Sequence, residues 1–189
     1  MPSPVHHATV RMIARGFELA IADLSRPIRT RIDIAMSQNF HGFRGEFSGS
    51  SKTPDLAVQF KNDTGGREIK FILEVGFSET YEELVKDAQL WLEGKPEVSV
   101  VWIVKFEESP RYQCPTRDLD DQAFEQLGFP KLEEIHDQDF TSMGRYGPVI
   151  YNGLTWVAPI STAFLEVWKR DSTTGAAIQD GSRTVRLLK

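Results

Sequence analysis

The chain has 189 residues, of which 40% are hydrophobic and 26% charged, and its formal net charge is −5 at pH 7. This length and hydrophobic content suit a single domain over residues 1–189 with a core of its own. The acidic balance counts against broad, sequence-independent affinity for nucleic acid, which usually needs an excess of Lys and Arg. A local basic face is compatible with that balance.

Cysteine content and hydropathy narrow the class of protein further. The chain has one cysteine, Cys114, which excludes an intramolecular disulfide framework. It contains no run of about 18 apolar residues that could span a bilayer, and its first residues lack the apolar core of a signal peptide. We therefore expect an intracellular protein, in the cytoplasm or the nucleus, with no membrane partner.

A helix is the first predicted element. Within residues 5–24 the apolar residues recur at helical spacing, and Pro27 ends the pattern. His6 and His7 are potential metal ligands, but adjacent histidines near a terminus more often have no such role. The densest basic zone of the chain lies here and supplies candidates for phosphate contacts, although an ordinary charged helix face is the alternative. Its residues are Arg11, Arg15, Arg26, Arg29 and Arg31.

Short extended segments are expected at residues 31–35 and 42–47, and a β-hairpin follows them. Residues 54–60 and 68–75 both alternate between apolar and polar side chains, which is typical of strands with one buried face. The connector is rich in residues that accept positive φ, so the two strands should pair in antiparallel fashion.

The hairpin register brings two acidic residues together. With the turn centred on Thr64-Gly65, Asp55 lies opposite Glu74 and Gln59 lies opposite Lys70. Directly opposed Cβ atoms are about 4.5–5.5 Å apart, so the two carboxylates repel unless a divalent metal ion lies between them. Alternatively, an Asp that follows Pro at a strand start is a turn former, and a strand Glu faces solvent.

A helix and a buried strand come next. Residues 78–93 form an amphipathic helix, with Ser78 as its N-cap, acidic residues in its first turn and Gly94 as its stop. Residues 98–106 are almost continuously apolar and β-branched, which is typical of a strand covered on both faces. The resulting order is hairpin, helix, buried strand.

This order resembles the PD-(D/E)xK nuclease superfamily, in particular its bacterial restriction-endonuclease-like branch and similar fungal proteins of unassigned role. The resemblance covers about residues 40–106 and rests on a few motifs, namely Pro54-Asp55, Leu73-Glu74-Val75, Ser78, the spacing of Lys86, Leu90 and Gly94, and the run from Trp102. It implies an α/β fold of restriction-endonuclease-like type, with a mixed β-sheet flanked by helices.

The resemblance also implies phosphodiester hydrolysis in DNA, assisted by Mg²⁺ or Mn²⁺. Asp55 and Glu74 would hold the metal ion, and a lysine would orient the attacking water and offset the developing charge. Glu46 is a candidate third acid, because the superfamily often places one upstream of the Asp. Where the superfamily motif has its lysine, two residues after the Glu, this chain has Gly76.

Two lysines are candidates for the missing role. Lys86 matches the helical position to which some branches of the superfamily move the lysine, but helical phasing turns it away from the apolar stripe, so a solvated surface lysine is the alternative. Lys70 shares the polar strand face with Glu74, and its alternative partners are Gln59 and Glu68.

The rest of the chain carries weaker signals. Prolines and acidic residues interrupt residues 107–153, where only 120–127 indicates a helix. His136 lies among acidic residues, but no helical register brings them together, so we interpret this stretch as a solvated loop rather than a metal site. Residues 164–170 and 176–188 are predicted strands that close or extend the sheet.

A Mg²⁺-dependent nuclease acting on DNA is therefore the leading expectation. The alternative is a catalytically degenerate member of the superfamily that serves as a binding or regulatory module, which Gly76 and the acidic balance favour. A small-molecule enzyme on an unrelated α/β fold is a third hypothesis. The chain lacks a Gly-rich phosphate loop, a nucleophile elbow and a Cys/His metal pattern, which counts against it.

Overall fold

The computed structural model describes residues 4–187, and its contacts divide the chain into two compact units. The first unit is Met1–Lys105 with Phe164–Thr184, and the second is Phe106–Ala163 with Val185–Lys189. Two compact units can still belong to one folding domain, so the single domain over residues 1–189 stays a prediction.

A mixed sheet of seven strands in the described residues organises the fold, in the order β1-β2-β3-β4-β8-β10 with β9 also paired to β8. Pairing is antiparallel for β1 with β2, β2 with β3 and β8 with β9, and parallel for β3 with β4. The strands are β1 Ile32–Ala35, β2 Leu56–Lys61, β3 Arg67–Gly76, β4 Val100–Glu108, β8 Ile160–Arg170, β9 Ala177–Gln179 and β10 Thr184–Leu187. An α/β fold with a mixed sheet is therefore confirmed.

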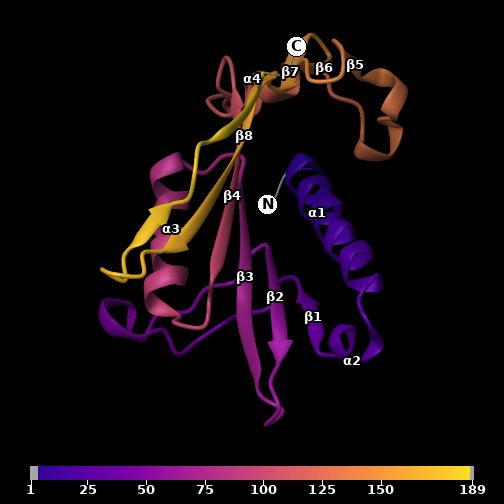
Figure 1. The fold of residues 1–189 in the computed structure, drawn as a ribbon. Coiled ribbons are helices and arrows are strands. Elements are labelled where there is room, and N and C mark those ends of the chain that lie inside the picture. Colours follow the sequence, from indigo (N-terminus) through magenta and orange to yellow (C-terminus); the bar gives the residue numbers. More distant parts are fainter. Residues whose placement is uncertain (1–3, 188–189) are drawn as a thin grey trace. The chain divides into compact units, whose positions relative to one another are not determined.

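Helices cover both faces of the sheet in the first unit (Figure 1). On one face lies α1 (Pro4–Ala22), whose Phe17 ring packs 4.7 Å from the Phe71 ring and 6.1 Å from the Trp102 ring, centroid to centroid. The short α2 (Arg26–Arg29) follows it, with Pro27 in its first turn. On the other face lies α3 (Tyr81–Gly94), whose side chains enter the main core.

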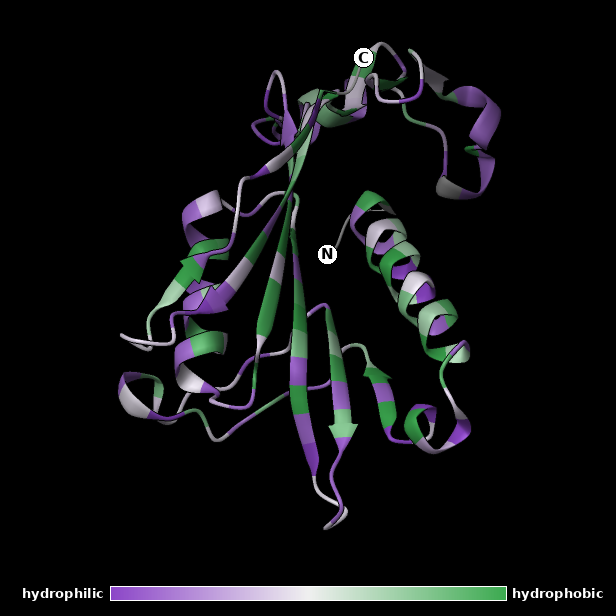
Figure 2. Cartoon of the chain, viewed as in Figure 1, coloured by the Kyte–Doolittle hydropathy of each residue, from purple (hydrophilic) through white to green (hydrophobic). Residues whose placement is uncertain are grey.

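The main core lies between α3 and the sheet. Burial of these apolar side chains, at roughly 25 cal/mol per Å² removed from water, is the chief stabilising term for such a layer. In Figure 2, β4 is mainly hydrophobic, whereas hydrophilic residues alternate with hydrophobic ones in the part of β3 near the hairpin turn. The buried core includes Ala57, Ile69, Ile72, Leu84, Ala88, Trp91, Leu92, Val98, Val101, Ile103 and Trp168.

The hairpin register is as predicted at one end and shifted at the other. Val58 pairs with Phe71, but Gln59 pairs with Ile69, so a β-bulge leaves Lys70 without a Cα partner in β2. The predicted pairing of Gln59 with Lys70 is therefore wrong. The bulge turns Ile69 onto the same face as Ile72, where both join the core, since an extra residue reverses the alternation beyond it.

Two other local predictions also need correction. The helix predicted from Ser78 begins at Tyr81, because Thr80 accepts the N–H of Glu83 and the Glu83 carboxylate accepts the N–H of Thr80 in a capping box. The segment expected to be extended at 42–47 contains a 3₁₀-helix, η1 (Gly45–Phe47).

One of the two predicted C-terminal strands is divided in the structure. Residues 164–170 lie in β8 as expected, but β8 begins earlier, at Ile160. The predicted strand over 176–188 is two short strands, β9 and β10, separated by a bend that includes Gly181 with φ +80°.

The second unit contains the helix predicted over residues 120–127, observed as α4 (Asp121–Gln126). A three-stranded antiparallel sheet was not predicted there, because strands of two to four residues are too short to show alternation. Its strands are β5 Thr141–Ser142, β6 Val149–Tyr151 and β7 Leu154–Val157, and two 3₁₀-helices precede them, η2 Leu132–Glu134 and η3 Asp137–Asp139. No helix in the described residues is long and apolar enough to cross a membrane.

Candidate functional site

The two predicted acids lie together where β2 begins and β3 ends. Leu56 pairs with Leu73, so the next step outward along the two strands places Asp55 opposite Glu74, as predicted. The backbone N–H of Val75 donates a hydrogen bond of 2.7 Å to Asp55 Oδ2, which fixes the Asp55 carboxylate against β3. The register near the start of β2 thus brings two carboxylates to one end of the hairpin.

Glu74 is almost completely buried, with 5% of its surface exposed. The indole N–H of Trp91 donates a hydrogen bond of 2.6 Å to Glu74 Oε1. Burial raises the pKa of Glu74 well above its ordinary value, and the negative charges of Asp87 and Asp55 raise it further, while the positive charge of Lys52 acts in the opposite direction. A buried carboxyl group with a strongly raised pKa is a frequent feature of functional sites.

Lys52 is the lysine whose charge acts on Glu74, although its sequence context did not mark it as a candidate. An isolated β-bridge with Phe40 holds its backbone, and its half-buried ammonium contacts Asp87 Oδ2 at 2.6 Å. Partial burial lowers the pKa of Lys52, but the charge of Glu74 and the hydrogen bond to Asp87 outweigh that effect and raise it. No local signal identifies Lys52, because its partners come from β3 and α3.

The packing of α3 limits the space for a side chain at Gly76, the position at which the superfamily that the sequence resembles has lysine. A Cβ atom built on Gly76 would lie 2.5 Å from Leu84 Cδ1, well inside the normal contact distance. Leu84 is fully buried in the core between α3 and the sheet. A lysine at position 76 would therefore require Leu84 to move.

The two lysines predicted as substitutes lie in other surroundings. Lys70 is exposed, and its ammonium forms an ion pair of 2.8 Å with Glu68 Oε2, one of the alternative partners considered above. Lys86 is exposed on α3, where its charge helps to lower the pKa of Glu83, after hydrogen bonds from Thr80. Catalytic roles for Lys86 and Lys70 stay predictions.

A further lysine, Lys105, pairs with Gly76 across β3 and β4. It is buried, and its ammonium donates a hydrogen bond of 2.9 Å to the backbone carbonyl of Phe77. This contact holds the Lys105 ammonium at the carboxyl end of β3, where Phe77 follows Glu74 by three residues.

His6 is the second residue whose position the sequence did not indicate. Its Nε2 lies 2.9 Å from Asp55 Oδ1, and 14% of its side-chain surface is exposed. His7, which follows it on α1, is exposed. The two adjacent histidines therefore differ: one contacts the candidate site and the other faces solvent.

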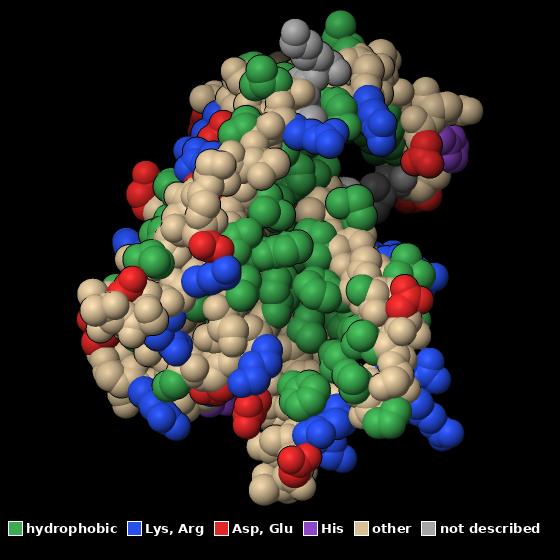
Figure 3. Space-filling view, in the orientation of Figure 1, with side chains coloured by type: hydrophobic (Ala, Val, Ile, Leu, Met, Phe, Trp, Pro, Cys, Tyr) green, Lys and Arg blue, Asp and Glu red, His purple; other side chains and the backbone are tan. Residues whose placement is uncertain are grey.

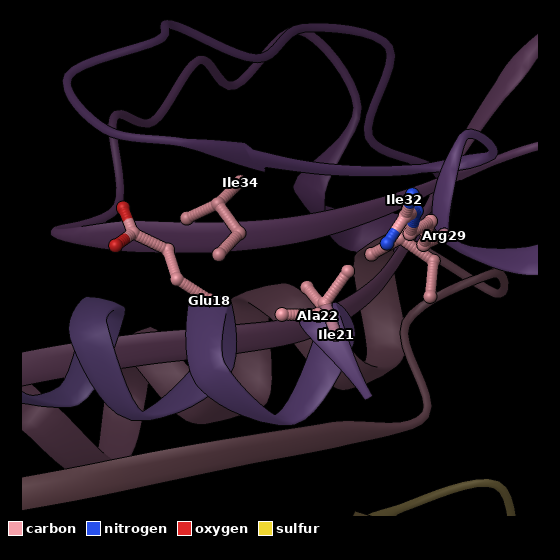
Figure 4. A pocket seen from close by; sticks show the side chains of 6 residues that line it. All are labelled: Glu18, Ile21, Ala22, Arg29, Ile32 and Ile34. Atoms are coloured by element: carbon pink, nitrogen blue, oxygen red, sulfur yellow. The ribbon is translucent and has the colours of Figure 1, made fainter. Parts of the chain in front are cut away.

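The basic zone predicted near the N-terminus is a surface feature of α1 and α2, where Figure 3 shows several Lys and Arg side chains. Two of its arginines are paired, Arg15 with Glu18 at 3.1 Å and Arg31 with Asp63 at 2.7 Å. An open groove of about 400 Å³ lies beside it (Figure 4), lined by Glu18, Ile21, Ala22, Arg29, Ile32 and Ile34. Glu46, the candidate third acid, is exposed in η1.

The donor set at Asp55 and Glu74 fits a hard divalent cation. Mg²⁺ is commonly bound in proteins through one or two carboxylates together with water molecules, and a cation between the acids would offset the repulsion that adds to the effect of burial on the pKa of Glu74. Across residues 4–187, no group of three or more His, Cys, Asp or Glu side chains is already arranged around one ion position. The carboxylates instead contact hydrogen-bond donors, namely Val75 N–H and the Trp91 indole.

Comparison of this chain with known protein families, curated proteins and solved structures identified no similar protein. No family model matches this chain, and neither a curated protein nor a solved structure matches it. The resemblance to the PD-(D/E)xK superfamily therefore rests on the motifs and the geometry described above, and membership of that superfamily is a proposal.

Proposed function

We propose that this protein is a Mg²⁺- or Mn²⁺-dependent nuclease of restriction-endonuclease-like fold that hydrolyses phosphodiester bonds in DNA. The observation that carries the proposal is the pair of Asp55, directly before β2, and Glu74 on β3, one step beyond the pair of Leu56 with Leu73, with Lys52 close enough to act on Glu74. The order of hairpin, α3 and parallel β4 supplies the scaffold.

In this proposal Asp55 and Glu74 hold the ion, and two neighbours keep them in place. The Val75 N–H orients the Asp55 carboxylate, and the Trp91 indole orients that of Glu74. When bound there, Mg²⁺ or Mn²⁺ polarises a phosphoryl oxygen and lowers the pKa of a water molecule. The carboxylates leave the remaining positions of the ion for water and substrate phosphate.

We assign the lysine role to Lys52 rather than to position 76. Its ammonium is half-buried beside the acids and stays protonated, since the charge of Glu74 and the bond to Asp87 raise its pKa despite partial burial. A fixed cation in a partly desolvated site stabilises the charge that develops on a phosphate in the transition state. The ion pair with Asp87 fixes the position of the Lys52 ammonium.

A catalytically degenerate protein that binds nucleic acid or regulates another protein is the second candidate. Gly76 supports this alternative, because a side chain built at this position would meet Leu84 Cδ1. In that case the acid pair and the fold are retained, whereas hydrolysis is lost.

Cleavage assays test the proposal. Supercoiled plasmid and single-stranded DNA are incubated with the purified protein in Mg²⁺, in Mn²⁺ or in EDTA, and cleavage is expected only with metal. Asp55→Asn and Glu74→Gln should each reduce the rate by roughly 10³-fold or more, because the two ligands act as a unit. Metal-dependent cleavage that survives both changes contradicts the site, and DNA binding without any cleavage supports the degenerate alternative.

The same assay ranks the lysines. Lys52→Met should reduce the rate by about 10²-fold, the usual effect of removing one group that stabilises transition-state charge. Lys86→Ala and Lys70→Ala serve as matched controls on exposed lysines and should change the rate by less than about threefold. A larger loss for Lys86→Ala than for Lys52→Met returns the role to Lys86, and the corresponding result for Lys70→Ala returns it to Lys70.

A further inference from the structure

We propose that the cations at the turn end of the β2–β3 hairpin form a binding site for a phosphate group of a DNA backbone. The site is a polar cavity of about 210 Å³, and its lining includes Arg31, Lys61 and Arg67. A guanidinium group matches phosphate oxygens in geometry, and a lysine supplies a compact positive charge. The inference goes beyond the proposed hydrolysis, because it requires no ion at Asp55 and Glu74.

The three cations stand in one row across neighbouring strands. Lys61, the last residue of β2, pairs with Arg67, the first residue of β3. Arg31 precedes β1 and lies one step beyond the pair of Ile32 with Phe60. The backbone N–H of Lys61 donates a hydrogen bond of 2.7 Å to the Arg31 carbonyl. Like charges at directly opposed positions are destabilising, so an anion that contacts two of the three cations would stabilise the row.

The β-bulge at Lys70 creates this row. Without the extra residue, the register would place Glu68 opposite Lys61. With the bulge, Arg67 takes that position, and Glu68 forms its ion pair with Lys70. The bulge therefore replaces an opposed pair of opposite charge by an opposed pair of like charge.

The surrounding acids leave the row with an excess of positive charge. Arg67 forms an ion pair of 2.7 Å with Asp33. Arg31 forms an ion pair of 2.7 Å with Asp63, whose side chain is 92% exposed. Lys61 is exposed, and among residues 4–187 it forms no ion pair. Three cations thus meet two carboxylates, so the cluster can accept the charge of an anion.

The size and the exposure of the cavity favour a polymer backbone over a small molecule. Cavities that enclose a small ligand usually measure about 300–1,000 Å³, whereas this one measures about 210 Å³. The side chains of Arg31 and Arg67 are 36% and 59% exposed. A single phosphate group fits there, and the groups attached to it stay outside the cavity, as they do in a nucleic acid strand.

The distance between this site and the acid pair suits one continuous duplex. β2 spans Leu56–Lys61, so at about 3.3 Å per residue Lys61 lies about 20 Å along the strand from Asp55. A duplex covers that length in about six base pairs at roughly 3.4 Å each. Phosphate contacts of this kind position a duplex without reading its sequence.

Binding of a fluorescein-labelled DNA duplex in EDTA, measured by fluorescence anisotropy, tests the inference without cleavage. Lys61→Gln should weaken binding about eightfold at roughly 0.1 M salt, and the salt dependence of log K should become shallower by about 0.9, the value for one lost phosphate contact. Lys70→Gln is the matched control, because it removes the same charge from an exposed lysine of β3 outside the cavity. Its affinity should change by less than about twofold.

Asp63→Asn tests the same site with the opposite sign. It releases Arg31 from its ion pair, so DNA binding should tighten by about threefold. Asp180→Asn removes the same charge from the exposed pair with Lys169 and should have less effect. Thermal melting checks the fold of each variant. If Lys61→Gln does not fold, the comparison of Asp63→Asn with Asp180→Asn decides.

The outcomes separate the inference from the proposed function. If the wild type does not bind the duplex, or if Lys61→Gln and Lys70→Gln bind it equally, the inference is overturned. Inorganic pyrophosphate or ATP that binds more tightly than the duplex, and loses its binding in Lys61→Gln, assigns the site to a small phosphorylated ligand and also overturns it. Asp55→Asn and Glu74→Gln should keep wild-type DNA binding, so loss of the proposed hydrolysis leaves the phosphate site intact.

Discussion

Two buried glutamates in the first unit, Glu74 and Glu166, differ in the partners that surround their carboxylates. Glu74 on β3 and Glu166 on β8 are 5% and 1% exposed, and each accepts a hydrogen bond from an indole N–H, of Trp91 at 2.6 Å and of Trp168 at 3.0 Å. Beyond that shared contact their surroundings differ.

Glu166 has a complete set of partners. Arg183 Nε donates to its Oε1 at 2.7 Å, and the Tyr81 hydroxyl donates to its Oε2 at 3.0 Å. The Arg183 guanidinium also lies 3.9 Å from the centroid of the Phe164 ring. A buried carboxylate paired in this way is a structural element that connects β8, the start of α3 and the segment after β9.

Glu74 lacks such a partner: among the described residues, the ion pairs include one at Glu166 and none at Glu74. The positive charge that acts on Glu74 is that of Lys52, and the Lys52 ammonium forms its ion pair with Asp87. Glu166 thus has a counter-charge in direct contact, whereas the positive charge of Lys52 acts on Glu74 without an ion pair between them. The comparison therefore separates a buried carboxylate that has its own ion pair from one that has none among the described residues.

The largest expected effect comes from removal of the partner of Glu166. Arg183→Met leaves a buried carboxylate without its counter-charge, and we expect it to lower the free energy of unfolding by about 3 kcal/mol, toward the lower end for such changes because the Arg183 side chain is 37% exposed. Urea unfolding measures the loss. As a control, Lys169→Met removes an exposed pair with Asp180 and should cost less than about 1 kcal/mol. Equal losses in the two variants would contradict the structural role of Glu166.

An intermediate effect on stability is expected when a bound divalent ion supplies the positive counter-charge of Glu74. An ion that binds only the folded state adds RT ln(1 + [L]/Kd), which is about 1.4 kcal/mol for roughly 10 mM Mg²⁺ and a site of about 1 mM affinity. For a chain of this size that corresponds to a rise in Tm of about 3–6 °C. Asp55→Asn should abolish the rise, whereas Lys169→Met should retain it. A Tm that Mg²⁺, Mn²⁺ and Ca²⁺ all leave unchanged argues against the metal centre.

The smallest expected effect is the change in stability caused by Glu74→Gln, and its direction depends on pH. Burial raises the pKa of Glu74 above its ordinary value of 4.5, so the folded state holds a proton that the unfolded state has released. Stability is therefore lost as pH rises from 4.5 through the raised pKa. Glu74→Gln removes this loss, and we expect the apo variant to be more stable than the wild type at pH 7 and similar to it near pH 4.

Glu166→Gln is the matched change and should have the opposite sign at pH 7, because it removes the ion pair with Arg183. Melting curves of the two variants over this pH range provide the measurement. If both substitutions destabilise the protein at pH 7, the distinction between the two glutamates fails.

The sequence by itself determined the elements of the hairpin, α3 and β4, and the juxtaposition of Asp55 with Glu74. These features depend on alternation, apolar runs and a turn of defined position, which are local properties of the chain. The alternation along the chain did not predict the bulge at Lys70. The bulge is stabilised by burial of Ile69 in a core to which α3 contributes largely, and that core is not a local property of the sequence.

Tertiary structure alone decided which cations and which imidazole reach the acids. His6 meets Asp55 because α1 packs on the sheet through Phe17, and Lys52 meets Asp87 because a bridge to Phe40 fixes the chain before β2. A side chain at position 76 would require Leu84 of α3 to move. Each of these contacts joins side chains from separate elements, so packing, rather than any pattern along the chain, sets the chemistry of the site.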